Sequence, residues 1–279
     1  MTAATTTTTT GGSADAAIAE AADRLWSAAV SGEPCAPVRD LLVGDDGTAA
    51  YAVAARNVAR MVEERGWRVC GRKIGLTSPV VQAQLGVDRP DFGALFAQVS
   101  HGDGEDVPTD ALLQPRVEAE IAVVLGADLD LGSHTVADVI AAVGFVVPAL
   151  EIVDSRIAAW DITFVDTVAD NASSGRHVLG TVPRTLDGLD LAAVPMELAV
   201  GGEVRSTGTG AACLGNPLFA LRWLADTMGR LGTPLRAGDV VLTGAVGPVV
   251  PVAAGDEVEA RFGDLGRVRC RFVEGGAGS

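Results

Sequence analysis

Hydrophobic residues near the N-terminus recur at the spacing of an amphipathic helix. One such face consists of Ile18, Ala22, Leu25 and Ala29. A second face consists of Tyr51, Ala55, Val58 and Val62. Gly32 and Gly66 stand where these helices are expected to end, and Asp46 is the expected N-terminal cap of the second helix. The pattern therefore predicts a helical N-terminal region over residues 14–66.

Residues 1–13 precede this region and have no hydrophobic pattern. They contain a run of threonine from Thr5 to Thr10, followed by two glycines and a serine. A segment with so little to bury cannot offset the entropy of ordering its backbone. We therefore expect residues 1–13 to form a disordered leader.

The pattern changes after Trp67. Short apolar runs bounded by Gly, Pro and Asp are typical of β-strands, and they predict strands over residues 69–76, 117–125, 145–153, 196–200, 240–243 and 258–262. Helices are predicted over residues 78–85, 135–143 and 217–231. Because the two kinds of element do not alternate regularly, a doubly wound parallel sheet is not expected. The pattern favours an α+β fold, with a mixed, strand-rich domain over residues 67–273.

The chain is acidic and has no predicted membrane span. Its 279 residues include 21 Lys and Arg against 36 Asp and Glu, which gives a net charge of −15. Because such a surface repels phosphates, we expect no nucleic-acid partner and no membrane partner. The sequence contains no apolar run of the roughly 18 residues that cross a bilayer. Its 48% hydrophobic content instead favours a homo-oligomer with a buried subunit interface.

The cysteines indicate a reducing compartment. Cys35, Cys70, Cys213 and Cys270 lie far apart, without the paired spacing of a disulfide framework or of a structural zinc site. The N-terminus also lacks the basic and apolar segments of a secretory signal. We therefore expect a cytoplasmic protein.

Three glutamates in predicted strands are the first candidates for chemistry. Glu118 and Glu120 are two residues apart, so both side chains leave the same face of a strand. A solvated edge strand would also produce such a pair, but the apolar residues 123–125 favour a central strand. Glu151 lies in an apolar strand, where a carboxylate needs either a salt bridge, for example to Arg156, or a cation. Three converging carboxylates could bind Mg²⁺ or Mn²⁺, which prefer oxygen ligands.

A lysine between apolar neighbours is the other candidate. Lys73 lies near a glycine, which would let a ligand approach the backbone. Its ammonium could reach solvent, bind a substrate carboxylate or exchange protons. The polar segment 166–175 is more typical of a hydrogen-bonded turn than of a site. The histidines His101, His134 and His177 are expected to be incidental.

Six motifs follow one another between about Arg72 and Phe272. They are Gly-Arg-Lys-Ile-Gly-Leu-Thr at 71–77, Pro-Asp-Phe-Gly at 90–93, Gln-Pro-Arg-Val-Glu-Ala-Glu at 114–120, Pro-Ala-Leu-Glu at 148–151, Phe-Val-Asp-Thr-Val-Ala-Asp-Asn-Ala-Ser at 164–173 and Gly-Asp-Val-Val-Leu-Thr-Gly at 238–244. In this order they resemble the fumarylacetoacetate-hydrolase superfamily. Within it, they are most similar to the 2-keto-4-pentenoate (2-hydroxypenta-2,4-dienoate) hydratase branch.

The resemblance implies a mixed β-roll with peripheral helices, usually in a homo-oligomer. It also implies that Glu118, Glu120 and Glu151 bind a divalent metal, Mg²⁺ or Mn²⁺. One departure is Asn216, at a position where relatives often carry histidine. Because asparagine cannot relay a proton, we assign no catalytic role to Asn216.

The resemblance further implies a substrate pocket. Lys73 and Asp91 match pocket residues of the family and are the expected catalytic pair. Leu76 and Ser173 are expected to contact the substrate together with them. Sequence alone does not show which of these residues lies within hydrogen-bond reach of a reacting atom.

The implied activity is hydration of a 2-hydroxy-2,4-dienoate in the meta-cleavage breakdown of aromatic compounds. A proton added at C5 gives a 2-oxo-3-enoate, water adds at C4, and a proton returned to C3 gives a 4-hydroxy-2-oxo acid. An aldolase of the same pathway is an expected partner. The alternatives are a 4-oxalocrotonate-type 2-oxo-acid decarboxylase, an acylpyruvate hydrolase and a non-catalytic partner of a decarboxylase. The motif at 90–93 favours the hydratase, and an intact set of three glutamates argues against a non-catalytic role.

Overall fold

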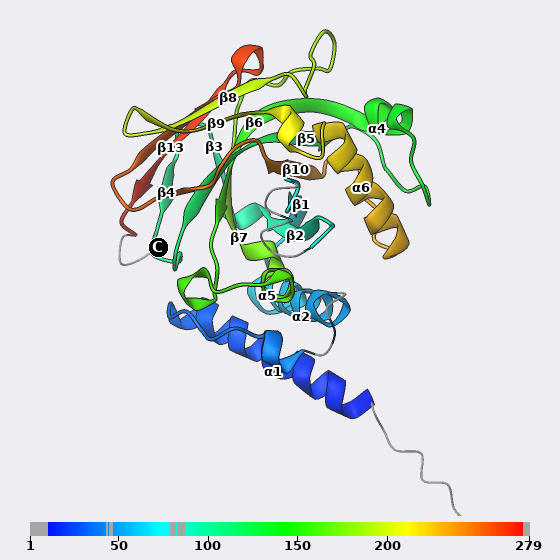
Figure 1. The fold of residues 1–279 in the computed structure, drawn as a ribbon, viewed down its shortest axis with the longest axis vertical. Helices are drawn as coiled ribbons and strands as arrows, with labels where there is room; N and C mark the ends of the chain where they lie inside the picture. Colours follow the sequence, from blue (N-terminus) through cyan, green and yellow to red (C-terminus); the bar gives the residue numbers. More distant parts are fainter. Residues whose placement is uncertain (1–10, 43, 45–46, 79–81, 83–86, 276–279) are drawn as a thin grey trace, which may run out of the picture.

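The computed structural model describes residues 11–42, 44, 47–78, 82 and 87–275. Its N-terminal part is a pair of helices that lie side by side at one end of the molecule (Figure 1). These are α1 (Gly11–Ser31) and α2 (Thr48–Arg65). Their apolar faces pack together and against the later helix α5 (Phe164–Ala169), so that Leu25, Val53 and Val168 belong to one cluster. The helices therefore dock onto the rest of the chain, but only partly through the predicted faces.

Ala22 and Leu25 of α1 are buried as predicted, whereas Ala29 is exposed. In α2 the predicted Ala55 and Val62 are exposed, and the buried residues are Ala50, Val53 and Ala54.

The two helix ends predicted from glycine are confirmed. Gly32 follows α1 with a φ of 75°, and Gly66 follows α2 with a φ of 67°. These left-handed conformations are accessible to glycine without strain, because glycine has no Cβ. Each glycine therefore allows the chain to leave the helix in a new direction.

The helix starts differ from the predicted ones. Helix α1 begins at Gly11, so residues 11–13 belong to the helix, while residues 1–10 of the expected leader lie outside the described residues. The alanine-rich sequence that follows has a high helix propensity and extends α1 into exposed positions. Helix α2 begins after Gly47, and Asp46, the expected cap, also lies outside the described residues.

The predicted strands belong to two β-sheets, which confirms the α+β class, and both sheets contain further strands that the apolar runs did not predict. The larger sheet has the strand order β2-β1-β10-β5-β6-β7-β3, and the short β11 lies beside β5. Its strands are β1 (Val69–Gly75), β2 (Asp91–Phe96), β3 (Ser100–Gly102), β5 (Arg116–Leu125), β6 (Val143–Val153), β7 (Ser174–Leu179), β10 (Val240–Ala245) and β11 (Val250–Pro251). The β1–β10 and β3–β7 pairs are parallel and the β1–β2, β5–β6 and β6–β7 pairs are antiparallel. The sheet is therefore mixed, as predicted.

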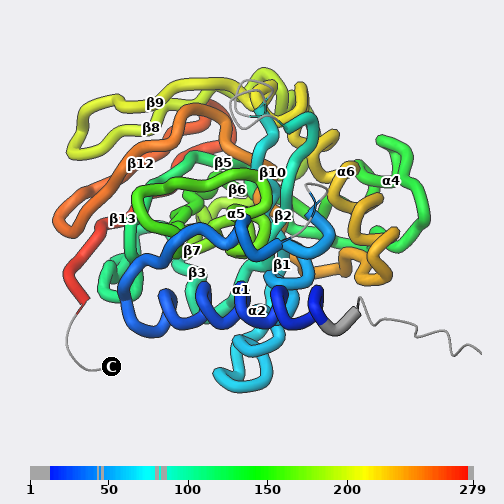
Figure 2. The backbone as a smooth tube through the Cα atoms, turned by 60° about the horizontal axis from the view of Figure 1, so that its bottom comes forward, coloured from blue at the N-terminus to red at the C-terminus, as the bar shows by residue number. Residues whose placement is uncertain are grey.

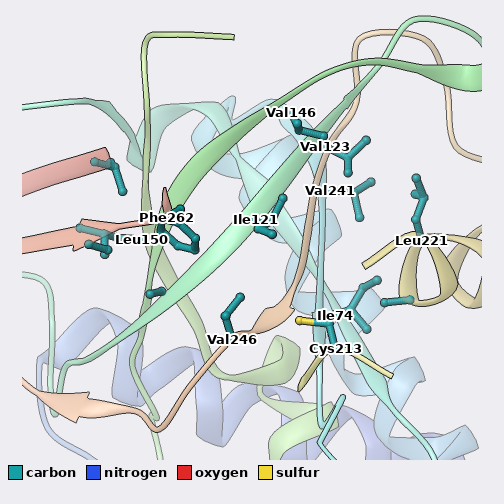
Figure 3. Packing of buried hydrophobic residues seen from close by; sticks show 14 of the residues in the cluster. Ile74, Ile121, Val123, Val146, Leu150, Cys213, Leu221, Val241, Val246 and Phe262 are labelled. Carbon is teal, nitrogen blue, oxygen red and sulfur yellow. The ribbon is translucent and has the colours of Figure 1, made fainter. Parts of the chain in front are cut away.

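The smaller sheet covers one face of the larger one. Its order is β4-β13-β12-β8-β9. The strands are β4 (Asp106–Pro108), β8 (Pro195–Val200), β9 (Glu203–Thr209), β12 (Glu257–Arg261) and β13 (Arg267–Val273). Figure 2 shows β8, β9, β12 and β13 side by side along one edge of the molecule. Ile121 and Leu150 of the larger sheet pack with Phe262, next to the smaller sheet, in the main hydrophobic core (Figure 3).

Alternation along β5 gives the larger sheet two faces with different roles. Val117 and Ile121 point into the core between the sheets. Glu118 and Glu120 occupy the intervening positions and therefore lie on the opposite face. Ala122 continues that face in a small apolar cluster with residues of β2, β6 and β10. Since β2 also contacts β7, this second face is curled in on itself and forms the inside of a β-roll.

Two further helices agree with the predicted ones within one residue at each end. They are α4 (Val136–Ala142) and α6 (Pro217–Arg230). Asn216 caps α6, because its side-chain oxygen accepts a hydrogen bond from the backbone N–H of Leu218 at 2.9 Å. The predicted helix over 78–85 lies mostly outside the described residues. Among the helices that the structure describes, none combines the length and the hydropathy that crossing a membrane requires.

Asp166 connects the N-terminal region to the strand-rich domain. Its buried carboxylate accepts hydrogen bonds from the backbone N–H groups of Val38, Arg39 and Thr163, each at 2.9 Å. The Arg39 guanidinium donates another at 2.8 Å and the Thr163 hydroxyl one at 2.9 Å. Burial alone would raise the pKa of Asp166, but these hydrogen bonds outweigh burial and hold the pKa below its usual 3.8. The ionised carboxylate therefore stabilises the folded state.

We predict that Asp166→Asn lowers the free energy of unfolding by about 3 kcal/mol, because an amide cannot accept from all these donors. Since folding depresses the pKa of Asp166, its stabilisation is present above about pH 4 and is lost in stronger acid. Urea unfolding at neutral pH and at about pH 3 should therefore show a difference between wild type and variant that shrinks in acid.

Asp161→Asn is the matched control for this experiment. The Asp161 carboxylate also accepts from the Arg39 guanidinium, at 2.8 Å, but its side chain is 64% exposed. An exposed ion pair of this kind contributes less than about 1 kcal/mol. Equal losses for the two variants would contradict the assignment of Asp166 as the connecting residue.

Candidate active site

Three predicted metal-ligand candidates meet on the inside of the roll. Glu118 and Glu120 leave the same face of β5, and Glu118 lies directly opposite Glu151 of β6 in the antiparallel register. One carboxylate oxygen from each of the three lies within 4.8 Å of the others. The structure therefore brings together the three glutamates that the sequence placed on two separate strands.

The glutamate oxygens lack the partners that buried carboxylates need. Glu120 and Glu151 have no exposed surface. Glu120 Oε2 accepts a hydrogen bond from the backbone N–H of Gly244 at 2.8 Å. No described residue donates a hydrogen bond to Glu120 Oε1 or Glu151 Oε2, and Glu151 Oε1 has only the ion pair with Lys73 at 3.2 Å. Because such burial is costly without compensation, and because Mg²⁺ and Mn²⁺ take oxygen ligands, these residues fit a hard divalent cation.

The electrostatics of the cluster favour a bound positive charge for the same reason. Burial, followed by repulsion from Glu151, raises the pKa of Glu118 to about 7. The same two causes raise the pKa of Glu120 well above its usual value. The three carboxylates therefore ionise together only when a cation or nearby positive side chains offset their repulsion.

Lys73 supplies one positive charge to this cluster. It lies on β1, is only 3% exposed, and its Nζ is 3.2 Å from Oε1 of Glu151. Burial alone would lower the pKa of Lys73, but Glu151 and Asp91 with the other carboxylates outweigh burial and raise it. Lys73 therefore stays protonated and does not reach solvent.

The suggested salt bridge between Glu151 and Arg156 is wrong. The guanidinium of Arg156 instead pairs with the Asp170 carboxylate and donates to the backbone carbonyls of Asp170 and Ser174. The physical reason is that Arg156 follows the end of β6, whereas Lys73 lies on the curled inner face that Glu151 shares. Proximity in sequence therefore did not identify the partner of Glu151.

Asp91 lies beside Lys73 at the start of β2. It is 2% exposed, lies opposite Gly75 in the β1–β2 register, and its Oδ1 accepts no hydrogen bond from a described residue. Burial raises the pKa of Asp91 to about 6, although the charge of Lys73 opposes this rise. A Cβ at position 75 would lie 2.1 Å from Oδ1 of Asp91. Only glycine at position 75 therefore leaves room for the carboxylate.

A cavity of about 710 Å³ opens above these residues. Lys73, Leu76, Asp91, Glu118 and Ser173 line it, so five predicted site residues share one cavity wall. Glu120 and Glu151 are absent from the wall and are fully buried beside it. The remaining lining is largely apolar and includes Ile74, Val153, Trp160, Ile162, Val246 and Val249. A small acid with a short hydrocarbon chain matches this combination.

A strained turn carries Ser173 into the cavity wall. The predicted hydrogen-bonded turn over 166–175 is instead the end of α5, the short helical turn η4 (Asn171–Ser173) and the start of β7. All three residues of η4 are left-handed, with φ of 55°, 52° and 51°. The Asn171 side chain holds this turn by accepting from the Ala94 N–H at 2.7 Å and donating to the Ala94 carbonyl at 3.0 Å. Strained non-glycine residues of this kind are typical of functional sites.

The sequence interpretation missed Arg116 and Trp160, which also line the cavity. Arg116 lies two residues before Glu118 on the same face of β5, so the alternation that paired the glutamates would have found it. Trp160 lies on the turn η3 (Ala158–Trp160) and has a φ of 54°, which no local pattern indicated. None of the histidines lines this cavity, and the expectation that they are incidental stays a prediction.

The chain belongs to the fumarylacetoacetate hydrolase family, because residues 55–273 match the family model described as fumarylacetoacetate (FAA) hydrolase C-terminal. It is 58% identical over 260 residues to a 2-keto-4-pentenoate hydratase of Burkholderia vietnamiensis, an alignment that covers 93% of this chain and 99% of the relative. It is 42% identical over 257 residues to a 2-hydroxyhexa-2,4-dienoate hydratase of Comamonas testosteroni, covering 90% of this chain and 96% of the relative.

Solved structures agree with the fold. A 4-oxalocrotonate decarboxylase of Pseudomonas putida, complexed with magnesium and adipate, has a TM-score of 0.86 and is 36% identical, with 93% of this chain and 98% of that chain covered. A fumarylpyruvate hydrolase of Pseudomonas aeruginosa, at 16% identity and a TM-score of 0.59 over 73% of this chain and 89% of that chain, shares the fold alone. These findings confirm the family and the fold predicted from the motifs.

We predict that Glu120→Gln lowers the affinity for Mn²⁺ at least tenfold, which is about the smallest effect of disturbing a metal ligand. The same substitution should raise the free energy of unfolding of the metal-free protein by about 1 kcal/mol, because a neutral amide replaces one of several mutually repelling buried carboxylates. Titration calorimetry with Mn²⁺ and urea unfolding in a chelator measure the two effects.

Glu203→Gln is the control, since Glu203 is 71% exposed and its ion pair, with Arg205, lies on the surface. It should change neither quantity measurably. Unchanged Mn²⁺ affinity in Glu120→Gln would show that the cluster does not bind the metal.

Proposed function

We propose that the chain is a divalent-metal-dependent hydratase that adds water to a 2-hydroxy-2,4-dienoate and gives a 4-hydroxy-2-oxo acid. The observation that carries the proposal is the convergence of Glu118, Glu120 and Glu151 beside a cavity of about 710 Å³. It is supported by 58% identity to a 2-keto-4-pentenoate hydratase over nearly the whole chain. The activity belongs to the meta-cleavage breakdown of aromatic compounds.

Glu118, Glu120 and Glu151 hold the cation, which is Mg²⁺ or Mn²⁺. The fit of hard oxygen donors supports this assignment, and so do solved relatives in complexes with magnesium and with calcium. A divalent cation bound there supplies Lewis acidity toward the 2-oxygen of the substrate. The three glutamates also fix the position of Lys73 through the contact with Glu151.

Lys73 and Asp91 are the catalytic pair. Asp91 presents a carboxylate oxygen with no hydrogen-bond donor among the described residues, in the wall of the cavity. A carboxylate placed in this way can take the proton of the 2-hydroxyl group and deliver a proton to a carbon of the substrate. Lys73 stays protonated beside it and keeps Asp91 ionised. Leu76 and Ser173, which line the same cavity as Lys73, contact the substrate.

The product chemistry supports the proposed partners. The 4-hydroxyl of the product lies β to the 2-oxo group, which is the arrangement that an aldolase cleaves. We include an aldolase of the same pathway as a functional partner. The proposal further comprises a homo-oligomer in the cytoplasm, because the apolar composition and the dispersed cysteines favour both.

A 4-oxalocrotonate-type decarboxylase is the second candidate, and one observation favours it. The decarboxylase of Pseudomonas putida shares the fold with a TM-score of 0.86. Its identity of 36% is nevertheless lower than the 58% and 42% found for the two hydratases. The hydratase is therefore the better supported activity.

An ultraviolet assay with 2-hydroxypenta-2,4-dienoate tests the proposal directly. We expect the dienol absorbance to fall with Mg²⁺ or Mn²⁺ present and to persist in a chelator. Parallel incubation with 4-oxalocrotonate measures released CO₂. Persistent dienol absorbance with metal present would refute the hydratase, and CO₂ release without hydration would establish the decarboxylase.

We predict that Asp91→Asn lowers kcat at least about 100-fold, because the amide cannot accept a proton. Its Mn²⁺ affinity should stay within about threefold of the wild-type value, since Asp91 is not among the three converging glutamates. Steady-state kinetics and Mn²⁺ titration on the same samples separate the two properties. A parallel loss of metal affinity and rate would assign Asp91 to the metal site instead.

A further inference from the structure

Arg116 occupies the same inner face of β5 as the metal-site glutamates. It lies two residues before Glu118 and opposite Val153 of β6 in the antiparallel register. Both Arg116 and Val153 line the cavity. Its guanidinium is therefore presented to the same space as Lys73 and Asp91, from the strand that carries two of the three glutamates.

The guanidinium of Arg116 lies near enough to Glu118 for its charge to lower the pKa of that carboxyl, but it makes no direct contact with a carboxylate among the residues that the structure describes. Its guanidinium makes neither a hydrogen bond nor an ion pair with any of them. Lys73, the other cation of the cavity, is matched by Glu151 at 3.2 Å. Of the two cations, Arg116 is therefore the one whose hydrogen-bond donors are free for a ligand.

An aromatic platform holds this guanidinium in place. The Arg116 guanidinium carbon lies 4.3 Å from the centre of the Trp160 ring. The Trp160 ring N–H donates to the Gln114 carbonyl at 3.1 Å, and the Gln114 side chain donates to the carbonyls of Ser155 at 3.0 Å and Ile157 at 2.8 Å. Stacking occupies the flat face of the guanidinium and leaves the N–H groups at its edge available.

The charges around the cavity require such a group if the substrate is an anion. Four carboxylates, those of Glu118, Glu120, Glu151 and Asp91, face a single lysine. A divalent cation and Lys73 together leave the cluster one negative charge in excess. Arg116 removes this excess, and its two-pronged edge matches a planar carboxylate. An incoming acid then meets no net repulsion.

We propose that Arg116, stacked on Trp160, binds the carboxylate of the substrate and so selects acids over their neutral analogues. This inference rests on the proposed hydratase function and adds a residue to its substrate site. Lys73 is thereby left to act with Asp91, because its charge is already used by Glu151. Trp160 is a positioning residue, since it acts on the substrate only through Arg116.

Arg116→Met tests the proposal in the Mg²⁺-loaded protein. We expect KM for 2-hydroxypenta-2,4-dienoate to rise about 10- to 100-fold, the usual effect of losing a hydrogen-bonded charge pair, with kcat within about threefold. Calorimetry with the unreactive acid 2-oxopentanoate should show the same loss of affinity. Binding of its methyl ester should be unchanged. Arg116→Lys keeps the charge but loses the two parallel N–H donors of the guanidinium. Its KM and its affinity for the acid should therefore lie between those of wild type and Arg116→Met.

Arg222→Met is the matched control. Arg222 also lies over an aromatic ring, with its guanidinium carbon 5.7 Å from the ring centre of Phe219 on α6, but it does not line the cavity. Its substitution should leave KM and both affinities unchanged. Trp160→Leu should raise KM less than Arg116→Met does, without affecting kcat, because it loosens the guanidinium without removing it.

Three results would overturn the proposal. They are wild-type affinity of Arg116→Met for 2-oxopentanoate, equal losses for the acid and its ester, and a loss confined to a dicarboxylic acid such as 2-oxoadipate. The last result would place a second, distal carboxylate on Arg116. If the wild type does not hydrate the dienoate, the proposed function fails, while the comparison of acid and ester still decides the role of Arg116.

Discussion

A cluster of three glutamates, two of them fully buried, beside one lysine constrains the rest of this structure. Glu120 and Glu151 are closed off from solvent, and Lys73 offsets one charge at 3.2 Å from Glu151. Such a cluster repels itself unless a cation joins it, so packing elsewhere must hold its strands together. The main core does this through Ile121 and Leu150, each adjacent in sequence to one of these glutamates and pointing to the other side of the sheet. The site and the core are therefore two faces of the same strands.

The pairing register of these strands follows from the use of one face for the site and the other for the core. Pairing Glu118 with Glu151 brings the carboxylates together, and a slip by one residue would turn them into the hydrophobic core. Pairing Gly75 with Asp91 leaves the room that the Asp91 carboxylate occupies. The cost of burying a carboxylate in the core exceeds the gain from any local strand pairing, so the chemistry of the site also helps to specify the fold.

Local alternation predicted the parts of the site that lie along one strand, and it failed where contacts come from distant strands. Glu118 and Glu120 were placed together correctly because residues two apart in a strand share one face. The same rule places Arg116 on that face, but the sequence interpretation did not recognise it. The suggested partner of Glu151, Arg156, was wrong because only the curled sheet brings Lys73 close to β6. Strand β13 was missed because arginines alternate with its buried Val268, Cys270 and Phe272 and break the apolar run. The left-handed conformations of Trp160, Ala172 and Ser173 have no signal in local sequence, since tertiary contacts impose them.

The N-terminal helices support the cavity without lining it. Residues of α1 and α2 do not appear in its wall, yet they pack on α5, and Asp166 of α5 is bonded to the connection that follows α1. Helix α5 leads directly into the strained turn Asn171–Ser173, and each left-handed residue there costs of order 1–3 kcal/mol. Only a turn anchored at both ends sustains that cost, and the anchors are α5 on one side and the Asn171–Ala94 hydrogen bonds on the other. The change of sequence pattern at Trp67 therefore marks a change of secondary structure. The placement of Ser173 depends both on the helices before Trp67 and on the strands after it.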